Sequence, residues 1–270
     1  MRQLQQQVKQ RKRIEVLGLL VDELTLDEAV ARIEAWVREK RENPAAPARR
    51  IITANPEYVM AARHDPELCR IVNSADMVTA DGIGLILAGK LLRRPFRSRV
   101  TGVALSHALA RHSAESGLGL FLLGAAPGIA EEAAAKFAEL YPGIKIVGIW
   151  AGQAGPEGDA ESLARIQAAK PDIVLVAYGM VKQDKWGVRN IEKSGAAAAI
   201  GVGGVFDYVS GHVPLAPPLL RKLGLEWAYR LYREPWRWRR QVALLAFIRA
   251  VAWEGASDVI NSLKGKFRAT

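Results

Sequence analysis

The chain is poor in cysteine and has no long hydrophobic run. Its single cysteine, Cys69, cannot form an intramolecular disulfide and supplies no thiolate cluster for a metal. Because Cys69 falls in an apolar helical pattern, a packed core thiol is favoured over a nucleophile. No stretch of about eighteen apolar residues occurs, so no segment is predicted to span a membrane. Residues 1–13 are polar and lack the apolar core of a signal peptide, which predicts a flexible leader on a cytoplasmic protein.

Several catalytic signatures are also absent. The four histidines show no H-E-x-x-H spacing, and no G-x-S-x-G elbow presents a serine nucleophile. No Asp-x-Asp motif is present to hold a metal-bound nucleotide diphosphate. The sequence therefore predicts no metal site and no resident cofactor.

The formal net charge of +10 is the first unusual feature that is present. From residue 221 to the end, eleven Lys/Arg oppose four acids, so an excess of +7 lies in the last fifth of the chain. Such asymmetry indicates an anionic partner, which from charge alone is nucleic acid, anionic lipid or a phosphorylated substrate.

Continuous apolar strands alternate with helical patterns over residues 14–218, which predicts an α/β fold with a Rossmann-like, mostly parallel sheet and helices on both faces. The predicted strands lie at residues 14–18, 51–52, 77–79, 118–123, 144–150, 172–177 and 197–202. One uninterrupted helix is expected over residues 56–73. Prolines at 214, 217 and 218 end the core domain, and residues 219–270 are predicted to form a helical, basic appendage.

Polar and small residues follow two strands near the middle of this pattern. Thr53 and Asn55 follow the strand at residues 51–52, and Asp81 follows the strand at residues 77–79. Because ligands bind at the carboxyl ends of parallel strands, we expect these side chains to face a ligand. Asp81 is the first candidate for chemistry, although Asp and Asn-Pro are also ordinary helix-start signals.

Further strand ends carry residues that suit ligand binding. Gly124 opens a Gly-x-x-x-Gly loop before a helix, which is compatible with either a diphosphate cradle or a tight turn. Gln183 follows the strand at residues 172–177, where a long amide suits a sugar hydroxyl or a uracil edge. Gly203 and Gly204 follow the last strand, where glycine permits close approach of the backbone.

The segment at residues 225–240 interleaves tryptophan and tyrosine with arginine, and residues 242–252 are mainly apolar. Aromatic rings suit the headgroup level of a bilayer, and guanidinium groups suit phosphate. A membrane surface is the first interpretation, packing on the protein's own core the second, and nucleic acid the third.

Taken together, the motifs resemble those of the WecG/TagA/CpsF glycosyltransferases, glycosyltransferase family 26. The matching motifs are Thr53-Ala54-Asn55-Pro56-Glu57, Ala80-Asp81-Gly82, Arg99-Val100-Thr101-Gly102, Gly179-x-x-x-Gln183, Val202-Gly203-Gly204-Val205-Phe206-Asp207 and Glu226-Trp227-x-x-Arg230-Leu231-x-x-Glu234-Pro235-x-Arg237. These six motifs occur in the same order over nearly the whole chain, which makes the resemblance specific.

The resemblance implies an inverting, metal-independent transfer of N-acetylmannosamine or a related sugar from a UDP-sugar to a polyprenyl-diphosphate-linked acceptor. It also implies a role in cell-surface polymer synthesis and peripheral attachment to the inner face of the cell membrane through the basic appendage, with no nucleic-acid partner. Self-association into a homo-oligomer is left open. Two positions depart from the family pattern: Asp184 follows Gln183 where Glu is usual, and Leu215 stands where Arg is common.

The mechanism that follows is a direct displacement, with Asp81 as the general base on the acceptor hydroxyl. Without a metal, cations must meet the charge of the departing diphosphate. The candidates for this binding are Arg99, Arg230, Arg237 and Arg240. Two other classes compete: a dinucleotide-binding oxidoreductase, and a non-enzymatic adaptor for membranes or nucleic acid.

Overall fold

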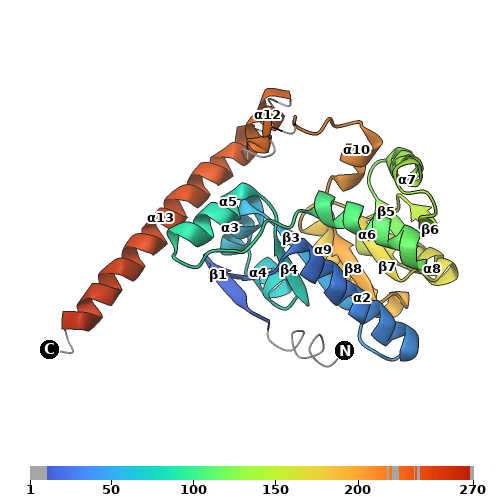
Figure 1. Ribbon diagram of the computed structural model, residues 1–270, viewed down its shortest axis with the longest axis horizontal. Helices are drawn as coiled ribbons and strands as arrows, with labels where there is room; N and C mark the ends of the chain where they lie inside the picture. Colours follow the sequence, from blue (N-terminus) through green and yellow to red (C-terminus); the bar gives the residue numbers. More distant parts are fainter. Residues whose placement is uncertain (1–10, 218, 221–224, 234, 236–237, 268–270) are drawn as a thin grey trace.

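A computed structural model describes residues 11–217, 219–220, 225–233, 235 and 238–267, without the side chains of 226, 230, 239–241 and 258–267. Six strands form one parallel sheet in the order β4-β3-β8-β7-β5-β6 (Figure 1). They are β3 (Arg49–Ala54), β4 (Met77–Ala80), β5 (Gly119–Gly124), β6 (Lys145–Trp150), β7 (Ile173–Ala177) and β8 (Ala198–Gly201). The predicted parallel α/β sheet is therefore confirmed.

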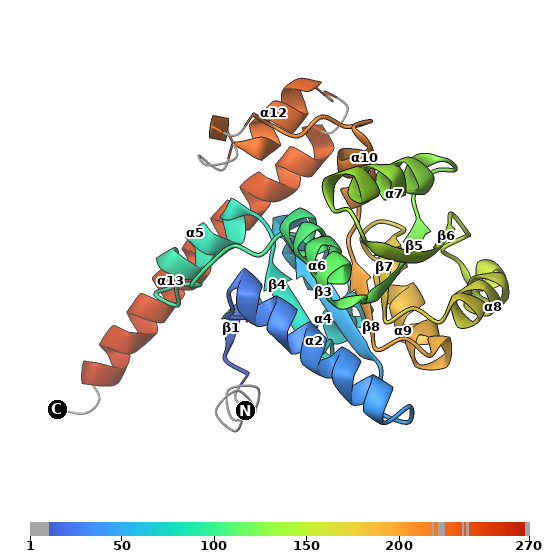
Figure 2. The same ribbon diagram turned by 45° about the vertical axis from the view of Figure 1, so that its right-hand side comes forward.

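Helices cover both faces of the sheet, as the rotated view in Figure 2 shows. One face packs against α2 (Leu26–Glu42), α6 (Gly102–Ser116), α7 (Ile129–Leu140) and α10 (Val205–Ser210). The other packs against α3 (Pro56–His64), α4 (Pro66–Asn73), α8 (Asp159–Ala169), which follows the short η1 (Pro156–Gly158), and α9 (Lys182–Ser194). Strand β5 shows why the strands read as continuous apolar runs. Leu120 and Leu122 enter one core and Phe121 and Leu123 enter the other, so every position is buried.

The N-terminal strand prediction was incomplete. Residues 13–22 form a two-stranded antiparallel hairpin, β1 (Arg13–Val16) and β2 (Leu19–Asp22), rather than one strand ending at Gly18. Leu17 and Gly18 make the turn with φ of 51° and 90°, and both values positive is the backbone of a two-residue hairpin turn. The hairpin packs its buried face against the core beside β4.

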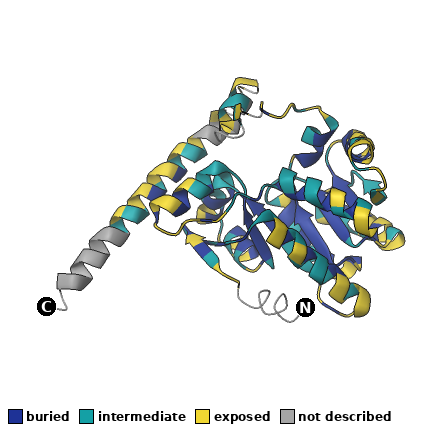
Figure 3. Cartoon of the chain, viewed as in Figure 1, coloured by how far each residue is buried: buried dark blue, intermediate teal, exposed yellow. Residues whose placement is uncertain are grey.

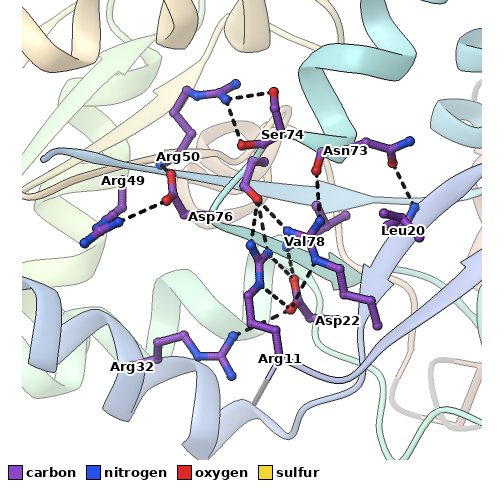
Figure 4. A network of polar contacts seen from close by, with 12 residues as sticks. Arg11, Leu20, Asp22, Arg32, Arg49, Arg50, Asn73, Ser74, Asp76 and Val78 are labelled. Atoms are coloured by element: carbon purple, nitrogen blue, oxygen red, sulfur yellow. Dashed lines mark hydrogen bonds and ion pairs between the residues drawn. The ribbon is translucent and has the colours of Figure 1, made fainter. Parts of the chain in front are cut away.

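A buried carboxylate ties this hairpin to the sheet (Figure 4). Asp22 is 3% exposed and accepts a 2.7 Å hydrogen bond from the backbone N–H of Val78 in β4. Arg11 makes a two-pronged pair with the same carboxylate at 3.0 and 2.8 Å, and Arg13 and Arg32 lie within 4 Å of it. A buried charge is tolerated only when it is paired and hydrogen bonded, and Asp22 meets both conditions.

The helix predicted over residues 56–73 is broken in two. Pro66 cannot continue α3, and Asp65 ends α3 and caps α4 by accepting from the N–H groups of Glu67 and Leu68. Helix α5 (Ile83–Leu91) follows β4, and a loop at residues 93–99 with four arginines comes after it.

After the core domain the described residues include α12 (Glu226–Arg233) and α13 (Trp238–Phe267). Helix α13 lies along α5 and α3 in both views (Figures 1 and 2). Phe247 and Val251 of α13 are 2% exposed and join the core around α3 and α5. The opposite side of α13 is exposed, including Leu245, Ile248 and Trp253, and appears yellow in Figure 3. None of the helices in the described part of the chain is long and apolar enough to cross a membrane.

Candidate active site

The carboxyl ends of β4, β3 and β8 lie side by side, and five of the eleven predicted site residues lie on or directly after them. Strands β3 and β4 run in register with Ala54 opposite Ala80, and the Asp81 N–H donates to the Ala54 carbonyl at 2.7 Å. Strand β8 flanks β3 on its other side. The sheet therefore brings Thr53, Asn55, Asp81 and the Gly203 turn to one edge, as the sequence predicted.

Asp81 is half-buried where β4 meets α6. Its Oδ2 accepts a 3.0 Å hydrogen bond from the N–H of Gly102, the first residue of α6. The positive end of a helix dipole stabilises a carboxylate at this position. Val100 donates to the Ala80 carbonyl at 3.0 Å, so the backbone beside Arg99 runs along the end of β4. The fold thus places an oriented carboxylate and an arginine on adjacent segments.

Thr53 and Asn55 are engaged by the protein itself. Thr53 is 6% exposed, and its hydroxyl donates to the Gly201 carbonyl at 2.9 Å, which ties β3 to β8. The Asn55 side chain accepts from the Tyr58 N–H at 3.1 Å and caps α3. Both side chains therefore fix the shape of the edge, and their contact with a sugar stays a prediction.

Gln183 lies on the first turn of α9 rather than in the strand-end loop where the sequence analysis placed it. It is 4% exposed, and its Oε1 accepts from the Gly203 N–H at 3.0 Å. Its Nε2 donates to the Tyr58 hydroxyl at 3.0 Å. The amide thus links α9, α3 and the turn after β8, and direct recognition of a sugar or uracil stays a prediction.

A carboxylate completes this buried network. The Tyr58 hydroxyl donates to Oδ2 of Asp184 at 2.9 Å, and the Val181 N–H donates to the same oxygen at 2.9 Å. Burial raises the pKa of Asp184 to about 6, and these hydrogen bonds only partly offset that effect. Burial, with the Asp184 charge beside it, also raises the pKa of the Tyr58 hydroxyl well above its usual value.

The turn after β8 depends on glycine. Gly203 has φ of 57°, and Gly204 is exposed where the backbone enters α10. At Gly201 a Cβ would lie 2.6 Å from the Gln183 Nε2, so a side chain there would displace the amide. This turn therefore offers accessible backbone at the predicted glycine positions.

Gly124 lies at the end of β5, next to β7 and away from Asp81. The connection from β5 leads outward to β6, whereas that from β7 leads back to β8, so this is a switch point in the strand order. A Cβ on Gly124, whose φ is 101°, would lie 2.8 Å from the Ala177 carbonyl carbon. Helix α7 then starts at Gly128 without a side-chain cap, an arrangement compatible with an anion at its first N–H groups.

Four steps separate β4 from β5, so Asp81 and Gly124 lie roughly 19 Å apart across the sheet edge. The Gly203 turn and Gln183 lie between them, at β8 and α9. Of the predicted arginines, Arg237 lies outside the described residues, and the side chains of Arg230 and Arg240 lie outside them as well. Their part in the site stays a prediction.

A six-stranded, doubly wound parallel sheet with an oriented carboxylate at its carboxyl edge defines an α/β enzyme of the Rossmann-like class. Comparison with known families narrows the class. The model of the glycosyl transferase WecG/TagA/CpsF family matches residues 14–259, and the chain belongs to this family. The protein is therefore a glycosyltransferase.

Two curated relatives align with most of the chain. A protein of Bacillus spizizenii (strain ATCC 23059 / NRRL B-14472 / W23) is 34% identical over 201 residues, which cover 74% of this chain and 77% of the relative. A protein of Bacillus subtilis (strain 168) is 33% identical over 205 residues, which cover 76% and 79%. Both are named N-acetylglucosaminyldiphosphoundecaprenol N-acetyl-beta-D-mannosaminyltransferase.

Sequence reasoning missed two residues of the site, Tyr58 and Asp184. Tyr58 reads as an ordinary core aromatic on a helix face, and its hydroxyl finds a partner 126 positions away. Asp184 is noticeable in the sequence only as a departure from the family pattern. Its burial beside a tyrosine needs the folded arrangement of α3 and α9.

Proposed function

We propose that the protein transfers N-acetylmannosamine from a UDP-sugar to a polyprenyl-diphosphate-linked sugar in cell-surface polymer synthesis. The observation that carries the proposal is the alignment of about three quarters of the chain with two relatives whose names state this transfer to an N-acetylglucosaminyl diphosphoundecaprenol. The placement of Asp81 at the edge of the sheet supports it, because the transfer needs a base beside an acceptor hydroxyl.

The reaction is an inverting displacement without a metal. Asp81 takes the proton of the acceptor hydroxyl as that oxygen bonds to the anomeric carbon of the donor. The bond from this carbon to the diphosphate oxygen breaks, and its electron pair leaves with UDP. The hydrogen bond from Gly102 orients the Asp81 carboxylate for this proton transfer.

The departing diphosphate carries negative charge that cations and N–H groups must meet. Arg99 lies on the segment that runs beside the end of β4, and Arg230, Arg237 and Arg240 are the candidates in the C-terminal segment. The uridine end of the donor points toward the switch point at the carboxyl ends of β5 and β7, whereas the diphosphate, which is bonded to the reacting carbon, stays beside Asp81.

The protein works on the inner surface of the cell membrane as a peripheral enzyme. The exposed side of α13 carries Leu245, Ile248 and Trp253, and the C-terminal fifth has an excess of +7. Apolar and aromatic side chains beside basic residues suit the headgroup region of an anionic bilayer. This arrangement would bring a lipid-linked acceptor to the sheet edge.

A UDP-release assay tests the function. A panel of UDP-sugars is incubated with the protein, with and without a polyprenyl-diphosphate-linked N-acetylglucosamine, and each reaction is run with and without EDTA. We expect rapid UDP release only with UDP-N-acetylmannosamine and acceptor together, and no loss of rate with EDTA. Release that ignores the acceptor, or none with any donor, contradicts the proposal. An NAD(P)H titration tests the oxidoreductase alternative, for which we expect no binding.

A further inference from the structure

We propose that Tyr58 and Asp184 are positioning residues that hold Gln183 and the Gly203 turn in the geometry that binds the sugar-nucleotide donor. The proposal rests on the proposed function, because it names the donor as the ligand of this part of the edge. Neither residue needs to touch the donor. Their effect passes through buried hydrogen bonds to groups that lie at the carboxyl ends of β7 and β8.

The hydrogen bonds form one connected chain across three segments. Asp184 accepts from the Tyr58 hydroxyl, the hydroxyl accepts from Gln183, and the Gln183 carbonyl oxygen accepts from the Gly203 N–H. Tyr58, Asp184 and Gln183 are 3%, 5% and 4% exposed. A buried network in which each group is satisfied fixes one arrangement of its members. Tyr58 thus couples α3 to the loop before α9 and to the turn after β8.

The loop before α9 holds backbone strain that this network stabilises. Val181 has φ of 71° and ψ of −51°, a conformation that a β-branched residue rarely adopts. Its N–H is held by Asp184 at 2.9 Å. Strained residues persist only where the surrounding structure imposes them, and they cluster at ligand sites. Asp184 therefore holds two groups in place: the loop between β7 and α9, and the Tyr58 hydroxyl.

Little space is left beside the network for water or another partner to replace a lost hydrogen bond. A cavity of about 10 Å³ lies beside Gln183, Asp184 and Arg50, which is room for one water and not for a sugar or nucleotide. The side of Gln183 that faces β8 is closed, since a Cβ on Gly201 would lie within 2.6 Å of its amide nitrogen. Loss of the Tyr58 hydroxyl would therefore change the Gln183 and Gly203 arrangement rather than be absorbed by a gap.

Three variants separate positioning from simple stability. Tyr58→Phe removes the hydroxyl, Asp184→Ala removes both hydrogen bonds to Oδ2, and Asp184→Asn keeps an oxygen that accepts both. We expect Tyr58→Phe and Asp184→Ala to raise the donor KM and the Kd of UDP about tenfold, the scale of one well-formed hydrogen bond. The acceptor KM should stay unchanged, and kcat should fall by much less than tenfold. Asp184→Asn should keep the donor KM and the Kd of UDP close to their wild-type values.

Ser113→Ala is the matched control, because Ser113 is a buried hydroxyl with two hydrogen bonds, to Leu118 and Lys145, at the opposite end of the sheet. Thermal unfolding of every variant accompanies the kinetics. The proposal is overturned if Tyr58→Phe loses stability as Ser113→Ala does while the donor KM and UDP affinity stay at wild-type values. A wild-type protein that releases no UDP with donor and acceptor would instead refute the proposed function.

Discussion

At the scale of single residues, Asp81 combines what a general base needs. It is half-buried, it directly follows β4 at one side of the parallel sheet, and one oxygen accepts from the first N–H of α6. The hydrogen bond from Gly102 at the start of α6 fixes the direction of the carboxylate. These features suit the proposed role of Asp81 as the general base.

Asp81→Asn is the direct test of this role. The amide preserves the size of the side chain and can still accept from Gly102, but it cannot take a proton. We expect kcat to fall at least about 100-fold, the lower end of what a general base contributes, while UDP affinity stays near wild type. Steady-state UDP release and calorimetric titration with UDP give the two numbers. Near-normal turnover would remove Asp81 from the base role.

Asp184 makes a separate prediction about pH and stability. Burial raises the pKa of Asp184 from 3.8 to about 6. The hydrogen bonds from the Tyr58 hydroxyl and the Val181 N–H and the charge of Arg50 act in the opposite direction. The charge of Asp81 acts on Tyr58, where it raises the pKa of the hydroxyl. The folded state therefore binds the Asp184 proton more tightly than the unfolded chain does. The stability that this proton supplies is full below about pH 4 and is lost as pH rises through about 6.

We expect the free energy of unfolding of the wild type to fall relative to Asp184→Asn between pH 4 and 7.5, by about 2 to 3 kcal/mol for a shift of this size. Asparagine removes the titration and keeps an acceptor for Tyr58 and Val181. Urea unfolding of both proteins across this range gives the difference directly, because the other carboxylates titrate alike in both. Parallel pH profiles would show that Asp184 does not titrate as described.

At the scale of elements, one side of α13 is buried against the core domain and the other side is exposed. Phe247 is buried against the core around α3 and α5, whereas its neighbour Ile248 is 53% exposed. Phe247→Ala should therefore lower the free energy of unfolding by about 3 to 5 kcal/mol, the usual cost of emptying an aromatic site. Ile248→Ser should leave stability nearly unchanged and weaken binding to anionic vesicles.

Chemical unfolding and vesicle sedimentation of the two variants separate the sides of the helix. The pair is matched, because both residues belong to the same turn and both substitutions remove apolar volume. Equal vesicle binding by Ile248→Ser and wild type would remove the exposed side of α13 from the membrane contact.

The sequence predicted most strands from their apolar runs: β5 and β7 are buried at every position, and β6 at the edge of the sheet is apolar and half-buried after Lys145. It failed where local backbone decided the outcome. Leu17 adopts positive φ in the hairpin turn without any turn signal of its own, and Pro66 divides a helix whose apolar pattern continues through the break. Boundaries of this kind depend on dihedral angles and caps rather than on hydrophobic periodicity.

The residues of the site also divide into those that the sequence predicts and those that only the folded structure shows. Asp81 and Gly203 were predicted because strand ends in a parallel sheet share one edge, which is a consequence of topology alone. The pairing of Tyr58 with Asp184 was not predicted, because the two residues are 126 positions apart and meet only when α3 and α9 pack on the same face of the sheet. Residues that act through buried hydrogen bonds leave no spacing signal in the sequence.

At the scale of the whole molecule, charge and shape are both asymmetric. The excess of +7 after residue 221 accompanies a long helix that lies along α5 and extends past the core domain (Figure 1). Helix α2 lies on the side of the core domain away from α13 in Figure 1. If the proposed membrane contact is electrostatic, its strength depends on where a positive charge is removed and not only on how many are removed.

We therefore compare Arg233→Gln/Arg249→Gln, at exposed positions of α12 and α13, with Arg38→Gln/Arg111→Gln, at exposed positions of α2 and α6. Both doubles lose the same net charge. Each basic residue near an anionic surface is worth about 1 kcal/mol, so the first double should bind anionic vesicles about 30-fold more weakly at low salt. The second should bind like the wild type. Raising ionic strength should weaken the wild type toward the first double, because salt screens exposed charges beyond about 10 Å. Equal loss in both doubles would mean that net charge alone, and not the C-terminal helices, drives the association.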